Sequence, residues 1–591
     1  MPITVEQMTI AGFLEIFRKI IRDKEAIPVP ALLRNPPDLL ERAKLYGVQY
    51  KNGSWGWSSN IWHRSAANTV VVDREEDLES EHKDLMLSVL EHMLCRPMIQ
   101  VDRNLGTPRS PAKMRARVYC DPQFPDIAHR WGEINFPGEP EAKPDAEMFM
   151  IPHFLNNPNI AGTHEMLRVL RFPHHWYTIC TTSSYQGEVK KSMLSHWIYW
   201  VYLKGGTGEH ASLKEFTVRR IDGSLKRIVM CCWGLTGSGK STHGMYVIDQ
   251  RIAQRLQDMF GVNLLEFVSD QAIRNDDICA VFRDGVYSPE RGSWTKTEDV
   301  DEGQVAMYRA GMSPQSLHEN TEWDREGNVS FKGEFFQHRG QLNRNARSVF
   351  MLEDTGYFDG SVDSSEPLNF AVFISPGYST DFAWLKIADP VFAAKVLADG
   401  RTVGHPAQSL KGVGQEKFES RYCLPFTMGV GNAEHVERFL SFLKQRQGTK
   451  NPIEVYQINT TGRVGTQVEE REVDLGGRKM RVTGPVFEER NGKRRPAGGT
   501  GPSIEETEVF LHQAARGAVS YEPHPVWGSK VLVPTRVPGL SDQRLSELNP
   551  FSYHSVEQMR KMLGQQVEQS KFHLSIQAPG LPEAVLSAMD F

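Results

Sequence analysis

The chain has 591 residues, of which 40% are hydrophobic and 24% are charged, an ordinary composition for a globular protein. Its formal net charge of −5 gives no electrostatic reason to expect nucleic acid or a membrane surface as a partner. The longest apolar runs, such as residues 370–374, are far too short to span a membrane, and the N-terminus lacks the pattern of a secretory signal.

Seven cysteines are scattered along the chain without a C-x-x-C pair. Cys231 and Cys232 fall in an apolar segment, where a buried thiol packs as a small hydrophobic side chain. This pattern favours a reducing compartment and argues against a zinc site built from cysteines, so we expect a cytoplasmic protein.

The region before residue 225 has the pattern of mixed helices and strands. Apolar residues recur at helical spacing near residues 13–21 and again over residues 80–95, which predicts two helices packed on a core. A turn at residues 106–111 leads into an alternating stretch, residues 113–119, that predicts a strand. A Trp-rich apolar helix is expected to follow Tyr185 and to end near residue 202.

Three polar features of this region carry little information singly. Arg109 is by itself a typical surface arginine. Lys190 and Lys191 form a pair of the kind found on solvated helix faces, and a lone histidine such as His210 is usually structural. Their interest depends on the motif that follows them.

That motif is Gly234-Leu235-Thr236-Gly237-Ser238-Gly239-Lys240-Ser241-Thr242, which fits the phosphate-loop pattern G-x-x-x-x-G-K-[ST] at every fixed position. The apolar run at residues 227–233 predicts a buried strand before it. Apolar residues at helical spacing between Met245 and Phe260 predict a helix after it. A strand and a helix are the flanks that the motif requires.

The residue types of this loop suit a bound triphosphate. Its glycines allow backbone N–H groups to turn inward and surround phosphate oxygens. Lys240 would reach the outer phosphates, and the Ser241 hydroxyl would ligate Mg²⁺. The motif therefore predicts a nucleotide site; the alternative is a glycine-rich turn that binds nothing.

Beyond the loop, residues 264–270 predict a strand that ends on Asp270, where a carboxylate could face the metal of a nucleotide. Asn275-Asp276-Asp277 offers further carboxylates nearby. Later segments predict strands at residues 348–352 and 369–374, a helix at residues 433–445, a glycine-rich closing lid within residues 384–415, and a long solvated loop at residues 462–498.

Taken together, these motifs resemble the ATP-dependent phosphoenolpyruvate carboxykinases, in order over roughly residues 100–545. The phosphate loop is similar to that family's G-L-S-G-T-G-K-T, and the interval of 19 residues between its metal-ligating lysine and histidine is kept between Lys191 and His210. Other matches are Arg109-Ser110-Pro111 to G-R-S-P, residues 185–191 to Y-G-G-E-M-K-K, Asn345-Ala346-Arg347 to N-T-R, residues 459–462 to N-T-G, and Gly499-Thr500-Gly501 to G-T-G.

The chain departs from the family's pattern at three places. The family's paired aspartates are matched to Asp270-Gln271, so one acid is missing; Asp270 is the expected metal ligand, and the pairing that leaves Gln271 at the metal stays open. The lysine and arginine that follow G-T-G in the family are Pro502 and Ser503 here. The first glycine of Y-G-G-E is Gln186.

The resemblance implies a two-lobed α/β fold, with a substrate-side lobe at residues 1–225 and a nucleotide-binding lobe with the phosphate loop at residues 226–591. It also implies conversion of oxaloacetate and ATP to phosphoenolpyruvate, CO₂ and ADP. Lys191, His210 and Asp270 would ligate Mn²⁺, and Ser241 would hold Mg²⁺. The implied substrate and phosphoryl contacts are Arg109, Tyr185, Lys191, Lys240 and Arg347; the implied nucleotide contacts are Gly234, Thr236, Gly237, Ser238, Gly239, Lys240, Ser241, Thr242 and Thr507.

Two other functions fit the same residues. One is a small-molecule kinase on this scaffold with a different phosphate acceptor, and the other is a nucleotide-binding protein without catalysis. The partners expected overall are a nucleotide and a small carboxylic-acid substrate, with no nucleic acid and no membrane, and the oligomeric state is left open.

Overall fold

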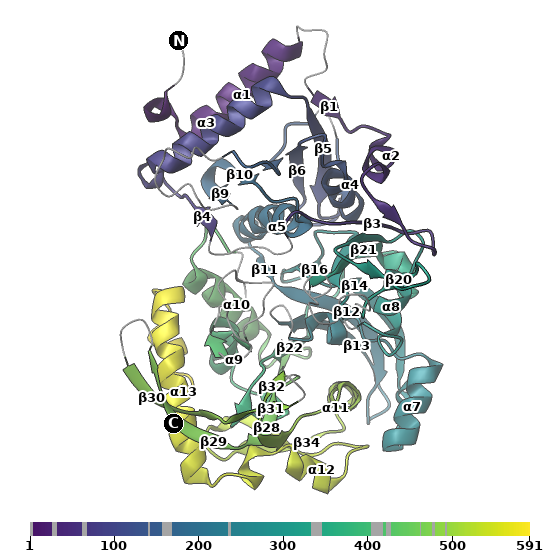
Figure 1. Ribbon diagram of the computed structural model, residues 1–591. Helices are drawn as coiled ribbons and strands as arrows, with labels where there is room; N and C mark the ends of the chain where they lie inside the picture. Colours follow the sequence, from purple (N-terminus) through teal and green to yellow (C-terminus); the bar gives the residue numbers. More distant parts are fainter. Residues whose placement is uncertain are drawn as a thin grey trace.

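The computed structural model describes residues 4–25, 32–61, 68–139, 142–155, 168–234, 238–298, 300–332, 345–403, 418–420, 427–460, 462–474, 479–490 and 493–591. Its helices are α1 Ile10–Glu25, α2 Leu39–Lys44, α3 Ser80–Cys95, α4 Pro125–Ile134, α5 Gln186–Leu203, α6 Lys240–Gly244, α7 Gln250–Phe260, α8 Val305–Gly311, α9 Pro390–Asp399, α10 Asn432–Arg446, α11 Ile504–Arg516, α12 Asp542–Glu547, α13 Val556–Gln577 and α14 Glu583–Leu586. Two large sheets and several small ones complete a mixed α/β fold (Figure 1).

The first large sheet is built from the N-terminal part of the chain, in the order β1-β5-β6-β8-β10-β9-β4. Its strands are β1 Leu32–Arg34, β5 Met98–Leu105, β6 Met114–Cys120, β8 Ala146–Ile151, β10 Tyr177–Thr181, β9 Arg168–Phe172 and β4 Thr69–Val71, with β7 Phe136–Pro137 paired to β5. The central strands β6, β8 and β10 are parallel neighbours, so their carboxyl ends meet at one edge.

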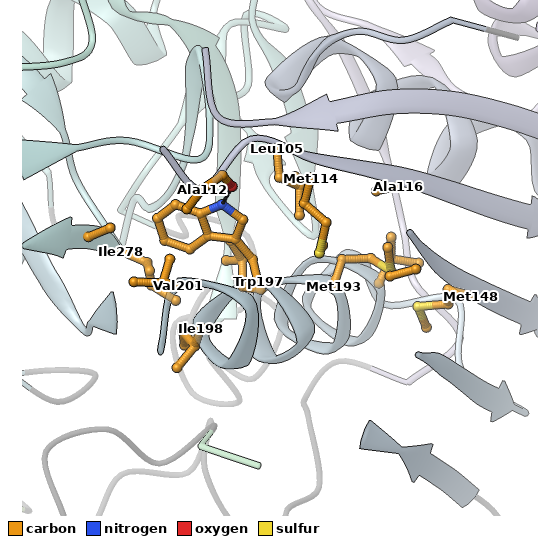
Figure 2. Packing of buried hydrophobic residues seen from close by; sticks show 14 of the residues in the cluster. Leu105, Ala112, Met114, Ala116, Met148, Met193, Trp197, Ile198, Val201 and Ile278 are labelled. Carbon is orange, nitrogen blue, oxygen red and sulfur yellow. Dashed lines mark hydrogen bonds between the residues drawn. The ribbon is translucent and has the colours of Figure 1, made fainter. Parts of the chain in front are cut away.

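Both faces of this sheet are buried, because successive side chains of a strand point to opposite sides. Tyr119 and Phe149 pack with α1 and α3 in one cluster. Val118 and Met148 pack in another cluster with α4 and α5. Figure 2 shows the α5 side, where the Trp197 indole lies against Met114 and its Nε1 donates a hydrogen bond of 3.0 Å to the Ala112 carbonyl oxygen.

The second large sheet has the order β14-β12-β13-β22-β27-β24-β35-β34. Its strands are β14 Val268–Asn275, β12 Ala211–Arg219, β13 Leu225–Trp233, β22 Phe370–Ile374, β27 Glu454–Ile458, β24 Trp384–Ile387, β35 Gly528–Arg536 and β34 Ser520–His524. The core strands β13, β22 and β27 are parallel. Helices α7 and α11 cover one face, and α9 and α10 cover the other.

Two of the smaller sheets lie between the two large ones (Figure 1). One consists of β11 Thr207–Glu209, β15 Cys279–Val281 and β16 Val286–Tyr287. Another has the order β17-β21-β18-β3-β2, with bounds Gly292–Lys296, Arg347–Met351, Leu317–Glu319, Trp55–Trp57 and Val48–Gln49. The remaining strands are β19 Glu322–Trp323, β20 Val329–Ser330, β23 Tyr378–Ser379, β25 Arg401–Val403, β26 Phe418–Ser420, β28 Arg463–Thr466, β29 Val468–Asp474, β30 Lys479–Pro485, β31 Phe487–Arg490, β32 Lys493–Pro496 and β33 Gly498–Thr500.

Most of the long predicted elements are confirmed, including the strand before the phosphate loop, which is β13, and the Trp-rich helix, which is α5. Three predictions are wrong. The expected helix over residues 245–260 begins only at Gln250, as α7, and the short helix α6 ends before it at Gly244. The expected strand at residues 264–270 is a 3₁₀ turn, Leu264–Glu266, followed by β14, which runs on to Asn275.

The third wrong prediction is the solvated loop at residues 462–498. Here β29 pairs with β30, and β31 pairs with β32, as two antiparallel hairpins. The first hairpin contacts α13, where Thr483 N donates a hydrogen bond of 2.9 Å to Gln565 Oε1.

Two further predictions concern larger regions. Residues 404–415 of the expected lid lie outside the described residues, and the expected boundary at residue 225 stays a prediction, although the second sheet already begins with β12 at residue 211. Among the helices of the described ranges, none combines the length and apolar character that crossing a membrane requires.

Candidate active site

Four buried side chains with basic nitrogens converge on the carboxylate of Asp277. Lys191 Nζ contacts Asp277 Oδ2, and Lys190 Nζ lies 3.2 Å from the same oxygen. On the other side, Lys240 Nζ donates a hydrogen bond of 3.0 Å to Asp277 Oδ1, and His210 Nε2 lies 3.2 Å from that oxygen. Each of the five side chains is about nine-tenths buried or more. We call this group the Asp277 cluster.

The cluster is assembled by elements that are far apart in the sequence. Lys190 and Lys191 lie in α5, His210 lies between β11 and β12, and Lys240 begins α6. Asp277 is held just after β14 by an Asx turn, in which Asn275 Oδ1 accepts hydrogen bonds of 2.7 and 3.0 Å from the backbone N–H groups of Asp277 and Ile278.

The segment next to His210 is fixed by a neighbouring buried network. Glu209 accepts hydrogen bonds of 2.6 Å from the Thr207 hydroxyl and 2.8 Å from Trp233 Nε1. His435 Nε2, from α10, lies 3.3 Å from Glu209 Oε1. Because each polar group of this network meets a partner, His210 is positioned by a rigid support.

Burial and mutual charge set the ionisation of the cluster. Burial, with the charges of Lys190 and Lys240, lowers the pKa of Lys191 to about 7, although Asp277 opposes the shift. Burial lowers the pKa of His210 to about 3, so its imidazole is neutral. Burial opposes ionisation of Asp277, but the charges of Lys191, Lys240 and Lys190 outweigh burial and hold its pKa well below the usual range.

A neutral amine, a neutral imidazole and a carboxylate are a nitrogen- and oxygen-donor set that suits a divalent transition metal. Two ligand atoms bound to one ion at 2.0–2.2 Å lie about 3.0–3.5 Å apart, and His210 Nε2 and Asp277 Oδ1 are 3.2 Å apart. The residues of the cluster therefore fit such an ion.

Asp276 lies beside the cluster and offers a further oxygen. Its Oδ2 accepts a hydrogen bond of 2.7 Å from the Thr295 hydroxyl. Its Oδ1 is buried without a hydrogen-bond partner among the residues that the structure describes. A second cation would satisfy this oxygen, because a buried carboxylate oxygen is costly to leave unpaired.

The position of Asp270 corrects the sequence-based assignment. Its side chain is exposed at the far end of β14, where the Ser269 hydroxyl donates a hydrogen bond to it, and Arg227 Nη1 donates one of 2.9 Å to its carbonyl oxygen. Asp277 lies seven positions further along this mostly extended segment, which corresponds to roughly 20 Å along the chain. The predicted convergence of Lys191 and His210 is confirmed, but the acid that they meet is Asp277.

The described part of the phosphate loop connects β13 to this cluster. Besides Asp277 Oδ1, Lys240 Nζ donates hydrogen bonds of 2.9 Å to the carbonyl oxygens of Asp276 and Asp277. Gly239, directly before α6, has φ +95°, which favours glycine. At Gly234 a Cβ would lie 2.4 Å from Ser238 Oγ.

The other predicted nucleotide contacts differ in their positions and burial. Ser241 and Thr242 follow Lys240 in α6 and are half-buried. Thr236 and Gly237 lie outside the described residues. Thr507 is buried in the core of the second sheet, where its hydroxyl accepts a hydrogen bond of 3.2 Å from Trp384 Nε1 and donates one of 3.0 Å to the Ser503 carbonyl oxygen. Its hydroxyl is therefore committed to the protein.

A second polar group adjoins the Asp277 cluster and contains Tyr185 and Arg347. The Arg347 guanidinium lies 4.5 Å from the centroid of the Trp294 ring, and its Nη2 donates a hydrogen bond of 3.0 Å to Asn345 Oδ1. The Tyr185 hydroxyl donates a bond of 3.2 Å to the same oxygen, and burial raises the pKa of Tyr185 to about 12. Lys190 Nζ, 6.0 Å from the Trp294 ring, joins the two groups.

Arg347 is the cation of this group that is suited to an anionic ligand. It is buried, and its Nε has no hydrogen-bond partner in the described ranges. Arg109, by contrast, is exposed on the turn after β5, and its charge acts on Asp363. No contact joins Arg109 to the Asp277 cluster within the described part of the chain.

The loop Gly499-Thr500-Gly501 is held by an arginine that sequence reasoning did not find. Arg544, in α12, donates hydrogen bonds of 3.0 Å to the Thr500 hydroxyl and 2.9 Å to the Gly501 carbonyl oxygen. Glu506 holds this guanidinium at 2.6 and 3.0 Å. Arg544 thus supplies an arginine next to this loop, although it is 43 residues beyond Gly501.

Asp277, Lys190 and Trp294 were also missed as site residues. The usable signal was the pair Asp276-Asp277 directly after a strand, but the strand was expected to end at Asp270. Trp294 carried no sequence signal, because an isolated tryptophan is most often a core residue.

Comparison with known proteins agrees with this geometry. The family model for phosphoenolpyruvate carboxykinase matches residues 65–371, just over half of the chain and a span that includes the Asp277 cluster and Arg347. A phosphoenolpyruvate carboxykinase (ATP) from Aeropyrum pernix is 27% identical over 187 residues, which are 32% of this chain and 34% of that protein. The match thus spans about a third of that relative's length. By the family match, the chain belongs to the phosphoenolpyruvate carboxykinase family of enzymes.

Proposed function

We propose that the protein is a nucleotide-dependent carboxykinase that converts oxaloacetate and ATP to phosphoenolpyruvate, CO₂ and ADP. The observation that carries this proposal is the convergence of Lys191, His210 and Lys240 on Asp277. It joins the donors for a divalent metal to the lysine of the phosphate loop, as a phosphoryl transfer coupled to decarboxylation requires.

In this proposal Lys191, His210 and Asp277 would hold Mn²⁺, while Asp276 and Ser241 would bind the Mg²⁺ of the nucleotide. Asp277 takes the metal-ligating role first expected of Asp270. A bound divalent cation would supply positive charge near the enolate that forms as CO₂ leaves. Lys191 can contribute as a neutral amine because burial brings its pKa to about 7.

The reaction breaks one carbon–carbon bond of oxaloacetate, and the electron pair of that bond forms the enolate of pyruvate. The enolate oxygen then bonds to the γ-phosphorus of ATP, while the bond from this phosphorus to the bridging oxygen of ADP breaks. Lys240 and Arg347 neutralise charge on the transferred phosphoryl group, and no protein nucleophile is needed. Tyr185, hydrogen-bonded through Asn345 to Arg347, orients the substrate.

We also propose that residues 1–225 and 226–591 act as substrate-side and nucleotide-binding lobes. Lys190 and Lys191 come from α5 of the first part, whereas Lys240 and Asp277 come from the second. A site built from both parts allows closure to exclude water from the enolate.

A small-molecule kinase with another acceptor is the second candidate. The exposed position of Arg109, the expected carboxylate clamp, favours it. The replacement at Gln186 does not, because this side chain faces α4, with its amide group within 3.2 Å of the Ile127 carbonyl oxygen and 3.1 Å of the Trp131 N–H. The change at Gln186 therefore leaves the Asp277 cluster unobstructed.

Phosphorus NMR of the purified full chain with oxaloacetate, ATP, Mg²⁺ and Mn²⁺ tests the two functions. We expect equal amounts of phosphoenolpyruvate and ADP, and loss of both products in Asp277→Asn. ATP turnover without phosphoenolpyruvate would contradict the proposal, and a screen of hydroxy and keto acids would then identify the acceptor of a kinase.

A further inference from the structure

A second cluster of metal-ligand side chains lies at the carboxyl edge of the first sheet, outside the Asp277 cluster. It consists of His92 in α3, Asp121 directly after β6, and His153 two residues after β8. Because β6 and β8 are parallel neighbours, their carboxyl ends bring Asp121 and His153 together, and α3 places His92 above them. No residue of this cluster has a role in the proposed reaction.

The two imidazoles converge on one oxygen. His92 Nε2 lies 3.0 Å from Asp121 Oδ2, and His153 Nε2 lies 3.2 Å from the same atom. The ring centroids of the two histidines are 4.8 Å apart. Ligand atoms at 2.0–2.2 Å from one ion lie about 3.0–3.5 Å apart, so these separations match those around a shared cation.

The remaining bonds of these residues fix the ligand atoms in place. Asp121 Oδ1 accepts a hydrogen bond of 2.9 Å from the Gln123 N–H, which leaves Oδ2 directed at the histidines. The carbonyl oxygen of His153 accepts one of 3.1 Å from the Thr182 N–H. Supports of this kind orient the ligands of metal sites.

Burial makes the cluster a poor place for an unshared carboxylate. The Asp121 side chain is 1% exposed, that of His92 is 9% exposed and that of His153 is 24% exposed. Nε2 of His153 is enclosed and makes no geometrically acceptable hydrogen bond in the described ranges.

We propose that His92, Asp121 and His153 bind one Zn²⁺ ion, with a water molecule or a small ligand as the fourth donor. Two imidazoles and a carboxylate are a typical ligand set for zinc. The ion would tie α3 to the ends of β6 and β8, and so would stabilise the first sheet at its carboxyl edge.

Zinc content after equilibrium dialysis of the full chain at micromolar free Zn²⁺ tests this site. Because the Asp277 cluster can also bind zinc, the measurement is made in the wild type and in a His210→Gln background. In both, His92→Gln and His153→Gln should each lower the bound zinc by one ion per chain. The matched control is His175→Gln, an exposed histidine of the same part of the fold, which should retain the full content.

Circular dichroism melts with and without zinc provide a second readout. We expect zinc to raise the melting temperature of the His210→Gln background and to have no such effect after His92→Gln or His153→Gln is added. Unchanged zinc content in both histidine variants, with all proteins folded, would overturn the site and leave a histidine–carboxylate ion-pair network. This result is independent of catalysis, so failure of the proposed reaction would not affect it.

Discussion

Two carboxylates of the second large sheet and its connections, the buried Asp277 and the half-buried Glu454, are each surrounded by lysines, yet their surroundings differ. At Glu454, in β27, Oε1 accepts a hydrogen bond of 2.9 Å from Lys226, and Oε2 accepts bonds of 2.8 Å from Lys386 and from the Tyr456 hydroxyl. Burial opposes ionisation of Glu454, but the two lysines outweigh it and lower its pKa to about 2.

The two groups differ in access to water and in the neighbours that remain. The side chains of Lys226 and Lys386 are 15% and 28% exposed, so their ammonium groups also reach solvent. The side chains of Lys190, Lys191 and Lys240 are at most 10% exposed, and they share Asp277 with a neutral imidazole. Ion pairing at Glu454 is complete, whereas the Asp277 cluster retains capacity for a metal and an anion. The same residue types thus form an ion-pair network in one place and, in our proposal, serve chemistry in the other.

The largest expected effect follows Asp277→Asn. This change removes a metal donor and the shared partner of three buried lysines, so we expect kcat/KM for phosphoenolpyruvate formation to fall by about 10³ or more. We also expect a loss of about 3–5 kcal/mol in the free energy of unfolding, because one member of a buried ion network is removed. Steady-state kinetics and urea unfolding measure the two effects.

Glu454→Gln is the matched control for that variant, since it also removes a carboxylate shared by lysines. Its kcat/KM should stay within about twofold of the wild-type value, because Glu454 contacts no residue of the Asp277 cluster in the described ranges. If the two variants lost activity equally, the contrast between the two carboxylates would be lost.

The second largest effect is expected at Arg347. Arg347→Gln should lower kcat by about 10²–10³, because it removes a buried positive charge that is proposed to act on the transferred phosphoryl group. Arg347→Lys should recover only part of this loss, since an ammonium group cannot reproduce the flat stacking of the guanidinium on Trp294. Equal kcat in wild type and Arg347→Gln would exclude a role for this charge in the transition state.

A smaller effect, on stability alone, is expected for Glu454→Gln. The folded-state pKa of about 2 lies below the ordinary value of 4.5, so the ion pairs stabilise the protein above pH 4.5 and lose this effect as the pH falls toward 2. The variant should be about 2–3 kcal/mol less stable at pH 7, and the difference should shrink below pH 4.5. Urea unfolding at several pH values measures it; a difference that grew in acid would have the wrong sign.

The smallest effect is expected for Asp270→Asn. Because Asp270 is exposed at the far end of β14, we expect kinetic constants within about twofold of wild type and a change in stability below about 0.5 kcal/mol. A loss of activity comparable with that of Asp277→Asn would restore the original assignment of the metal ligand.

The outline of the fold could be predicted because long apolar patterns largely determine whether a segment forms a helix or a strand. Residues 227–233 and 369–374 are continuous apolar runs, and they form the parallel strands β13 and β22. The hairpins of residues 462–498 carry mostly charged side chains and few buried apolar ones, such as Val482, so the local pattern does not predict strands. Pairing between the strands determines their structure.

Most of the side chains that the structure brings together around Asp277 could be named from the sequence. Lys191, His210, Lys240 and Arg347 were found because each belongs to an ordered motif. Asp277 was missed because the apolar residues Leu264, Leu265 and Phe267 have the pattern of the start of a strand. In the structure they form a 3₁₀ turn and the residue that ends it. The strand then begins four residues later than expected. Its pairing with β12 contains two register shifts, so the end of the strand cannot be predicted from the local pattern. Only the spatial pairing of β12 with β14 places the acid.

Anomalous diffraction from crystals grown with Mn²⁺ and ATP would test the Asp277 cluster most directly. We predict a manganese peak within about 2.0–2.3 Å of Lys191 Nζ, His210 Nε2 and a carboxylate oxygen of Asp277, next to the triphosphate on Lys240. A peak coordinated by Asp270, or no manganese between these three side chains while ATP is bound, would contradict the account.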